Sequence, residues 1–508
     1  MINWIVRYAA LLARHPELFD RERRVLEVGS GSEGIARALK RTVVGLDRVF
    51  WGTPNPDLSA VRGSVLELPF ADAAFDDVVC VDTLEHLAAS ERPAAIRELV
   101  RVAAKRVIIS GPAGVFAREG DAAYADLIRK SGGVLPGWLE EHLRFGIPAL
   151  ADLLQALLDA GRPFAVHVNE GMIQHYSGLL ADNVPFVAQL EARHEQKFPT
   201  ASPLRAADGD TPYSYLITID ACSAWQTPSM DGSTEPASAH FPIVAQPPGS
   251  VAMFAVGHRA DRMPAIPNVR RILAGGCGPD VSFDADILRD DTGDSICERN
   301  PRYSEMTAIY WVWKNVTTLD AVGFCHYRRY FDFRSTIEPS GRATYLHDPR
   351  QVRIYQDHFA DPAVVSRYLA DGAVVVARPW ELPCGNAELY MNSHVPEHYL
   401  VMMNYILACH PHLAPQVVAQ VRDSRLTANN MFLMRWPDFD RLCRFWFDCL
   451  FAIDAELRTE PSGYQQRVVA FLSERVFDIH VRWLRDSGRR VVECPIFHLE
   501  DSAFSREA

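Results

Sequence analysis

The sequence predicts two α/β domains joined by a linker, and three observations lead to this fold class. The chain has 508 residues, which is more than a single domain usually holds. In both halves, apolar runs typical of strands alternate with helical segments. Between the halves, 13 of the 25 residues in 226–250 are Pro, Ser, Thr or Gly, and such a stretch buries little apolar surface. We therefore expect domains at 1–225 and 251–508 with a linker at 226–250.

The composition is that of a globular protein that does not bind nucleic acid. Hydrophobic residues make up 48% of the chain and charged residues 23%. With 52 Lys and Arg against 64 Asp and Glu, the net charge is 52 − 64 = −12, which disfavours nucleic acid and anionic membranes as partners. No apolar run reaches the roughly 18–20 residues that a membrane span needs. The ten cysteines form no C-x-x-C pair and no zinc-type spacing, so we expect reduced thiols in a cytoplasmic protein.

In the N-terminal half, strands and helices alternate along the chain. An amphipathic helix near the N-terminus comes first, with its apolar face packed on the domain. We then predict strands at 23–30, 42–47, 75–82, 105–112, 163–170 and 214–221, and helices at 34–41 and 92–103. This alternation indicates a mostly parallel sheet with both faces covered. Ligands bind such sheets at the C-terminal ends of the strands, where the strand order reverses.

The first predicted strand ends in a Gly-rich turn, Glu27-Val-Gly-Ser-Gly. Gly29 and Gly31 permit a tight turn and a close approach of a ligand to the backbone. The second strand ends at Asp47, about 20 residues further on, where a carboxylate can accept both hydroxyls of a ribose. A plain strand-to-helix turn and a solvent-facing acid are the alternatives for these residues taken singly.

A longer motif distinguishes between nucleoside ligands. Residues 63–87 read GSVLELPFADAAFDDVVCVDTLEHL. Together with the Gly-rich turn and Asp47, this run resembles class I S-adenosylmethionine (SAM)-dependent methyltransferases of the type 11 group that modify small molecules and glycans. The resemblance covers 24–112 and implies a Rossmann-like fold extending to about residue 222. It argues against a dinucleotide cofactor.

The methyltransferase resemblance implies roles for individual residues. Glu27 would orient the methionine amine, Gly29 and Gly31 would lie against the ligand, and Asp47 would bind the ribose. Ser64, Val65, Leu46 and Arg48 would border the adenine, and Asp82 would lie near the methionine end. Two departures leave a degenerate binding module open as an alternative: Glu33 stands at the third glycine position, and Ser64 replaces an acid.

Methyl transfer to a hydroxyl benefits from a general base that removes its proton. Asp82 and His86 are the candidates that we favour, with His142 and His175 as further ones; a structural role in the helix is the alternative for His86. The stretch 133–161 resembles insertions in methyltransferases encoded beside polysaccharide genes. It implies a sugar acceptor.

The C-terminal half carries a second set of motifs. They are LRDDTGDSICERNPRYSEMTAIYWVWKNV, GFCHYRRYF, NNMFLM and FLSERVF. Over about 250–485 they resemble the DUF4422 family of exopolysaccharide and capsule biosynthesis, whose members are generally regarded as glycosyltransferases. The resemblance implies a GT-A-like α/β domain that uses a nucleotide-sugar donor.

A predicted strand at 319–325 delivers the basic motif His326-Tyr-Arg-Arg at its C-terminal end. Arg328 and Arg329 can bind a diphosphate beside His326, and an Arg pair neutralised by Glu305 is the structural alternative. Many nucleotide-sugar transferases carry an acidic metal site at this position, where this chain has His-Tyr-Arg-Arg instead. We therefore predict no metal site here and leave the metal dependence of the second domain open.

Several polar residues are candidates for the acceptor side of the second domain. For the general base we name Asp332 and Glu474, with Glu388 and Asp423 as weaker candidates. Glu474 could equally form a structural ion pair with Arg475. Asn430, with Asn429, precedes a predicted strand and can face a sugar, unless the pair only forms a turn.

Together these features predict a bifunctional enzyme of polysaccharide assembly. It would transfer methyl from SAM to a sugar and glycosyl from a nucleotide sugar to a glycan or lipid-linked glycan acceptor. The assembly machinery could hold it at a membrane surface. The alternatives are one active glycosyltransferase with a degenerate methyltransferase module, or a non-catalytic scaffold.

Overall fold

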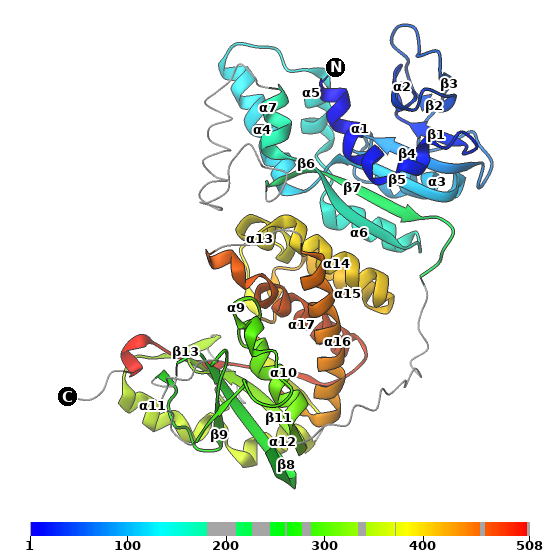
Figure 1. Cartoon of the computed structure of the whole chain (residues 1–508). Coiled ribbons are helices and arrows are strands. Elements are labelled where there is room, and N and C mark those ends of the chain that lie inside the picture. The colour runs from blue at the N-terminus through cyan, green and yellow to red at the C-terminus, as the bar shows by residue number, and fades with distance from the viewer. Residues whose placement is uncertain are drawn as a thin grey trace. The chain divides into compact units, whose positions relative to one another are not determined.

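The computed structural model describes most of the chain, and its contacts divide the chain into two compact units (Figure 1). The described residues are 2–179, 210–225, 244–259, 262–276, 286–333, 342–370, 372–457 and 463–504. The first unit comprises Met1–Met230 with Ala387–Arg422, and the second Asp231–Asn386 with Asp423–Ala508. Most of the predicted linker, 226–243, lies outside the described residues, so the predicted domain boundaries stay a prediction.

The first unit is built on a sheet with the strand order β3-β2-β1-β4-β5-β7-β6. Its strands are β1 (Val25–Val28), β2 (Val43–Asp47), β3 (Leu58–Arg62), β4 (Phe75–Val81), β5 (Ala103–Pro112), β6 (Phe164–Gly171) and β7 (Pro212–Asp220). The first five run parallel, whereas β7 is antiparallel to both β5 and β6. The order reverses between β1 and β4, and open α/β sheets of this kind bind ligands at the carboxyl ends of the strands at such a point. The predicted Rossmann-like sheet is confirmed.

Helices of the first unit cover this sheet. They are α1 (Ile2–Arg14), α2 (Ala36–Leu39), α3 (Arg92–Val102), α4 (Gly114–Lys130), α5 (Gly137–Phe145), α6 (Leu150–Asp159) and α7 (Met172–Leu179). The predicted N-terminal amphipathic helix is confirmed as α1. Its Tyr8 and Leu11 are buried in one apolar cluster with Val25 and Val79 of the sheet. Apolar burial therefore fixes α1 beside the start of β1.

Three helices from later in the chain also belong to the first unit. They are α13 (Asn386–Ser393), α14 (Pro396–Cys409) and α15 (Ala414–Arg422), with only Asn386 outside the unit. Strand β6 is at the edge of the sheet, and the side chain of Asn404 on α14 bonds its exposed backbone. The Val166 N–H donates to Asn404 Oδ1 (2.9 Å), and Asn404 Nδ2 donates to the Val166 carbonyl (2.8 Å). This pair of bonds satisfies polar groups that an edge strand leaves unpaired.

The second unit contains a mixed sheet with the central order β10-β9-β8-β11-β12-β19-β13, extended by β17, β14 and β18. Its strands are β8 (Val244–Gly257), β9 (Val269–Leu273), β10 (Ile287–Arg289), β11 (Val316–His326), β12 (Arg329–Phe331), β13 (Ala343–Leu346), β14 (Val374–Ala377), β17 (Phe432–Arg435), β18 (Val491–Cys494) and β19 (Ile496–Leu499). A separate pair joins β15 (Trp380–Glu381) and β16 (Arg425–Leu426). Strands β8 and β11 are parallel, so their C-terminal ends meet at one edge. This unit is α/β, as predicted.

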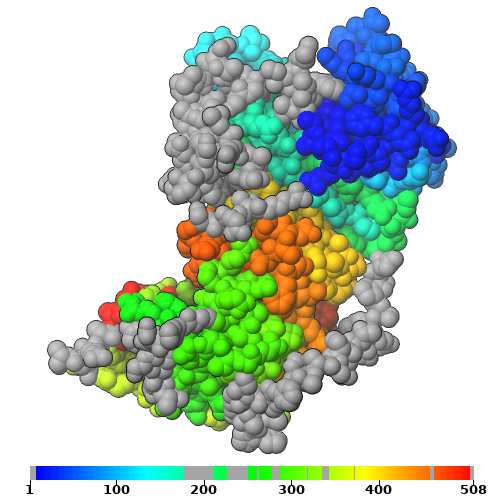
Figure 2. All heavy atoms as spheres, viewed as in Figure 1, coloured from blue at the N-terminus to red at the C-terminus, as the bar shows by residue number. Residues whose placement is uncertain are grey.

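The helices of the second unit pack on this sheet and on one another. They are α9 (Asn300–Tyr303), α10 (Met306–Asn315), α11 (Pro349–Tyr355), α12 (Pro362–Ala370), α16 (Trp436–Glu456) and α17 (Val468–Asp486). Helix α16 packs against α10, α17, β11 and β17. Figure 2 shows the green α10 and the orange α16 in contact on the viewed face. The stacked rings of Trp446 and Phe477 join α16 to α17.

Two further expectations concern reduced cysteines and the absence of a membrane-spanning segment. Eight cysteines of the described part are free, as expected, but Cys297 is disulfide-bonded, so the expectation of reduced thiols is wrong there. Among the described residues, no helix combines the length and the apolar character that crossing a membrane requires.

Candidate functional site

Glu27 is a fully buried carboxylate at the end of β1. It is held from two sides: the Tyr8 hydroxyl donates to Oε1 (2.7 Å) and the Ile35 N–H donates to Oε2 (2.6 Å). Burial raises the pKa of Glu27 from 4.5 to about 7, although these two hydrogen bonds oppose the shift. A buried acid poised near neutrality, at the end of a strand, suits the binding of a cationic ligand group.

The Gly-rich turn after β1 needs its glycines for two different reasons. Gly29 has φ +77°, and a Cβ there would lie 2.0 Å from Thr83 Oγ1. Gly31 has φ +55°, but a Cβ there would meet no atom within 4 Å. Gly29 is therefore required by the packing of the protein itself. Gly31 instead borders open space that a ligand can use.

These two glycines predict different consequences of substitution. Gly29→Ala should lower the free energy of unfolding by about 2–4 kcal/mol, because the new methyl group collides with Thr83 in a strained conformation. Gly31→Ala should cost only about 1–2 kcal/mol through its left-handed backbone. Denaturant unfolding measures both effects. Thr83→Ala should relieve part of the Gly29→Ala defect, and equal losses for the two glycine variants would contradict this assignment.

The predicted nucleoside-binding residues surround the same turn. Asp47 accepts hydrogen bonds from the N–H groups of Gly31 (Oδ2, 2.8 Å) and Val49 (Oδ1, 3.2 Å), which fix its carboxylate beside the turn. Ser64 Oγ accepts from the Leu66 N–H (3.2 Å), and Val65 is buried next to it. Leu46 is buried and Arg48 exposed. The Glu33 carboxylate, which replaces the third glycine, accepts from Asn55 Nδ2 (3.3 Å).

Asp82 follows β4 and adopts a left-handed conformation, with φ +43°. Its Oδ2 lies 2.8 Å from Arg7 Nε on α1. Burial raises the pKa of Asp82, and the nearby Arg7 guanidinium partly opposes that rise. Helix α1 thus contributes adjacent residues to both acids of this edge: Tyr8 contacts Glu27, and Arg7 contacts Asp82.

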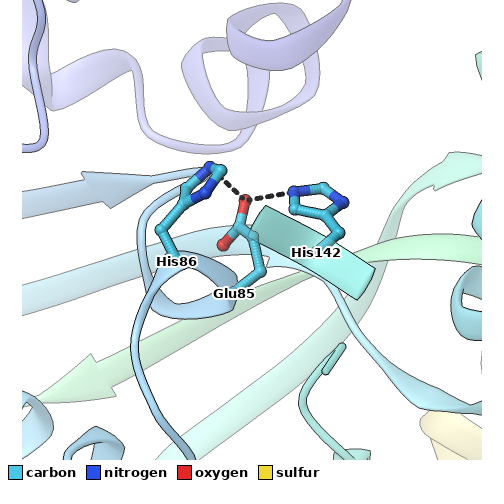
Figure 3. Close-up of side chains that lie close together, drawn as sticks. All are labelled: Glu85, His86 and His142. Carbon is cyan, nitrogen blue, oxygen red and sulfur yellow. Dashed lines mark ion pairs between the residues drawn. The ribbon is translucent and has the colours of Figure 1, made fainter. Parts of the chain in front are cut away.

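A Glu–His–His group lies immediately beyond Asp82 (Figure 3). Glu85 and His86 are on the turn η2 (Leu84–His86), and His142 is on α5. Glu85 Oε1 is 3.9 Å from His86 Nε2 and 4.0 Å from His142 Nε2. Burial, with a contribution from the charge of Asp82, raises the pKa of Glu85 far above its usual range. Burial lowers the pKa of His86.

The remaining candidate base of this half, His175, occupies a neighbouring position. Its Nδ1 lies 3.2 Å from Glu170 Oε2, and its ring stacks on Tyr213 with 3.5 Å between centroids. The charges of Glu170 and His175 both act on Asp82. The structure therefore brings Asp82, His86, His142 and His175 to one end of the sheet, where proton transfer and acceptor binding are chemically feasible.

The second unit gathers basic side chains at the ends of β8 and β11. His258, which follows β8, has its pKa lowered by burial and by four arginines: Arg259, Arg262, Arg328 and Arg467. Arg328 forms an ion pair with the exposed Asp501. The side chain of Arg329 is half-buried, and among the described residues it forms no hydrogen bond or ion pair. A cluster of this charge density with an unneutralised guanidinium suits a phosphorylated ligand.

Carboxylates and amides lie directly beside this basic cluster. Asn430 Nδ2 donates to Glu305 Oε1 (2.8 Å) and to Ser473 Oγ (2.8 Å). The Asn429 N–H donates to Glu474 Oε1 (2.9 Å), and His326 Nε2 contacts the Asn429 carbonyl. Both asparagines are left-handed, with φ +72° and +48°. Burial raises the pKa of Glu474, the charge of Glu305 raises it further, and Arg329 and Arg475 oppose the shift.

The structure thus brings together most of the predicted residues of the second domain. His326, Arg329, Glu305, Asn430 and Glu474 interact directly or through their charges. The ion pair considered for Glu474 with Arg475 is present (3.3 Å), and the partner of Glu305 is Asn430 in place of the expected arginine. The asparagine pair forms a turn and also contacts both carboxylates.

Other candidate bases lie elsewhere. Asp332 is buried at the far end of β12, where its N–H donates to the Pro495 carbonyl and its own carbonyl accepts from Cys494 Sγ. Asp423 pairs with Arg482 (2.7 Å). Glu388 is on α13, in the first unit, where its charge acts on Tyr215. None of these contacts links them to Glu305 or Glu474.

Sequence reasoning missed several residues that complete the two groups. In the first unit they are Arg7, Tyr8, Asp121, Glu141 and Glu170; in the second they are His258, Arg467 and Ser473. Tyr8 and Ser473 had a usable signal, since Tyr8 is on the apolar face of the predicted N-terminal helix and Ser473 is within the FLSERVF motif. His258 ends the apolar run that opens the second domain. For the others no motif singled out the residue, and only the fold brings them close.

Comparisons with known proteins find two different families along the chain. Residues 26–109 match the family model described as a methyltransferase domain, and residues 252–485 match that of DUF4422, a domain of unknown function. The chain therefore joins a methyltransferase domain, of the transferase class, to a DUF4422 domain. The comparison with curated proteins gives no match.

Among solved structures, the bifunctional glycosyltransferase WbbM, in its apo form, is 22% identical with a TM-score of 0.45. The match covers 50% of this chain and 46% of WbbM, so the chain spans a little under half the length of that protein. A putative methyltransferase from Bacillus halodurans is 16% identical (42% of this chain, 100% of that one, TM-score 0.27). Magnesium protoporphyrin IX methyltransferase from Synechocystis, with bound S-adenosylhomocysteine (SAH), is 19% identical (43% and 81%, TM-score 0.24).

Proposed function

We propose that the first domain binds SAM and transfers its methyl group to a hydroxyl of a sugar acceptor. The observation that carries this proposal is the arrangement around Gly31. Open space next to its backbone is flanked by the buried Glu27 and by Asp47, at the point where the strand order reverses. An ammonium group and a ribose diol, both present in SAM, are the groups that two such carboxylates bind.

The residues present fit this cofactor. Glu27 would hold the amine of the methionine part, and the oxygens of Asp47, which each accept one backbone N–H, retain lone pairs for the ribose hydroxyls. Ser64 and Val65 would border the adenine. SAM supplies a methyl group already activated on a sulfonium, so the protein mainly has to align the acceptor. Asp82, held by Arg7, would take the proton of the acceptor hydroxyl, with His86 beside it.

For the second domain, we propose glycosyl transfer from a nucleotide-sugar donor to a glycan or lipid-linked glycan. Arg328 and Arg329 would bind the diphosphate and stabilise its developing charge as the leaving group departs. Glu474 or Glu305, whose charges act on each other and on this motif, would receive the acceptor proton, and Asn430 would orient a sugar. Action of both domains on one glycan would make the chain a bifunctional enzyme of polysaccharide assembly in the cytoplasm.

Calorimetric titration of the full chain with SAM, and then with a panel of nucleotide sugars, tests this proposal. SAM should bind at one site, and Asp47→Ala should weaken it by about 30–100-fold, as expected for about 2–3 kcal/mol of lost hydrogen bonding. Asp126→Ala, at an exposed acid on α4, is the matched control and should leave SAM binding unchanged. Absence of SAM binding at millimolar ligand would refute the methyltransferase proposal.

A further inference from the structure

The Glu85–His86–His142 group has the composition and geometry of a metal site. One potential ligand atom from each of the three residues lies within 4.8 Å of the others, and Glu85 Oε1 is 3.9 and 4.0 Å from Nε2 of His86 and His142. Figure 3 shows the Glu85 carboxylate between the two imidazole rings. Glu85 is 1% exposed and His142 6% exposed, and Glu85 Oε1 has no hydrogen-bond partner among the described residues. A buried carboxylate oxygen without a donor is costly unless something positive binds it.

Each imidazole has a second carboxylate near its Nδ1, but only His142 forms a hydrogen bond with it, because His86 Nδ1 has no hydrogen-bond partner among the described residues. His142 Nδ1 is hydrogen-bonded to Asp121 Oδ2 at 2.7 Å, and His86 Nδ1 lies 2.7 Å from Glu141 Oε2. Asp121 is itself fixed by the hydroxyls of Tyr176 (2.8 Å) and Tyr213 (3.1 Å). Because Nδ1 of His142 donates to Asp121, its Nε2 carries the lone pair and faces Glu85 Oε1, and His86 Nε2 lies at a similar distance from the same oxygen. Metal-ligating histidines are held in this way by outer carboxylates.

The distances are close to those of an occupied site. Metal–ligand bonds of about 2.0–2.2 Å at tetrahedral angles separate neighbouring ligand atoms by roughly 3.4 Å. The distances from Glu85 Oε1 to Nε2 of His86 (3.9 Å) and of His142 (4.0 Å) exceed this separation by about half an ångström. Small side-chain rotations can remove that difference. Asp82, Glu85, Asp121 and Glu141 also make the surroundings strongly acidic, so a dication would relieve repulsion between carboxylates.

We propose that Glu85, His86 and His142 bind one divalent metal ion of the zinc type, through Glu85 Oε1 and the two histidine Nε2 atoms. Three protein ligands leave a fourth position open, as in sites where the metal acts on a substrate. Two imidazoles and one carboxylate favour zinc or a similar transition metal over magnesium or calcium, which prefer oxygen ligands alone.

The place of this site in the fold suggests what the open position binds. Glu85 is three residues after Asp82, at the same end of β4 as the Gly-rich turn. If the proposed methyl transfer is correct, a sugar hydroxyl bound at the open position would have its pKa lowered beside the transferred methyl group. Metal binding itself does not depend on that function, so the two proposals can fail separately.

Titration of the full chain with Zn²⁺, in competition with a chromogenic chelator and without SAM, tests the site. Wild-type protein should bind one equivalent, and the same site loaded with Co²⁺ should show the intense visible absorption of four- or five-coordinate cobalt. His86→Ala, at a partly exposed ligand, should reduce Zn²⁺ affinity at least 100-fold. Glu85→Gln should do the same without changing the size of the side chain. His358→Ala, at an exposed histidine of the second unit, is the control and should bind Zn²⁺ as wild type does.

One further variant separates a built site from adventitious binding. Glu141→Gln, at a half-exposed outer carboxylate, should weaken Zn²⁺ binding about 10–100-fold while leaving the fold intact. Zn²⁺ affinity that is unchanged in His86→Ala and Glu85→Gln would overturn the proposal. Calorimetry with SAM on the same variants reports separately on the proposed methyl-donor site.

Discussion

Replacing Arg329 by alanine should weaken the binding of a nucleotide-sugar donor by about 10–100-fold, the effect of losing one charge-assisted hydrogen bond worth about 1.5–3 kcal/mol. The reason is that this half-buried guanidinium has no ion-pair partner among the described residues and lies next to His326 and Glu474. Its removal breaks no ion pair among the described residues, so stability should change little. Calorimetry with the best donor of a nucleotide-sugar panel measures the effect.

Two variants control this experiment. Arg328 is already paired with Asp501, so Arg328→Ala should weaken the donor less than Arg329→Ala unless the donor displaces Asp501. Arg367→Ala removes an exposed arginine from α12 and should leave donor binding unchanged. If donor affinity survives both Arg328→Ala and Arg329→Ala, the diphosphate is bound elsewhere.

Replacing Glu27 by glutamine should remove a large pH dependence from the first unit. The pKa of Glu27 is raised from 4.5 to about 7 by burial, so between these values the native state holds a proton that the unfolded chain has lost. The stability contributed by Glu27 is therefore greatest below pH 4.5, falls by about 3 kcal/mol as the pH rises to 7, and is constant above. Glu27→Gln should abolish this decline, as measured by hydrogen exchange of the β1 amides across that range.

The same titration should control SAM binding in the opposite direction. A bound ammonium group favours the ionised carboxylate, so SAM affinity should fall about tenfold per pH unit below pH 7. Glu27→Gln should bind SAM weakly at every pH, without this slope. Glu33→Gln, at an exposed acid of the same turn, is the control. It should keep the wild-type pH dependence of both the stability and the SAM affinity. A wild-type SAM affinity that does not vary between pH 5 and 7 would exclude a direct contact of Glu27 with the amine.

The strands of the first unit could be predicted because local signals and long-range packing agree there. Runs such as 105–112 are apolar, end at glycine or proline and become the buried strand β5. The Gly-rich turn and Asp47 were equally visible, since a strand end fixes where its last side chain points. The Glu–His–His group was not, because His142 is far from Glu85 in sequence and matches no metal spacing. Only the packing of α5 against η2 joins them.

The second site shows the same limit. The strand β11 placed His326 and both arginines from sequence alone. The bonding of Glu305 to Asn430, across 125 positions, depends on β17 pairing with β11 and on the left-handed turn before β17. Asp332 stays a prediction: its N–H donates to the Pro495 carbonyl after β12, a contact that involves neither His326 nor Glu474. Sequence proximity therefore identified the motif but not which carboxylate accompanies it.

The contacts of α1 give the N-terminal helix a thermodynamic role. Arg7 and Tyr8 contact Asp82 and Glu27, the acids proposed to take the acceptor proton and to bind the methionine amine. Fraying of the helix would leave both acids without these partners. A ligand that binds more tightly when α1 is packed on the sheet must also stabilise that packing. The factor by which packing raises the affinity equals the factor by which the ligand shifts the equilibrium toward the packed helix. The order of the first turns of the chain and the occupancy of the pocket are therefore a single coupled equilibrium.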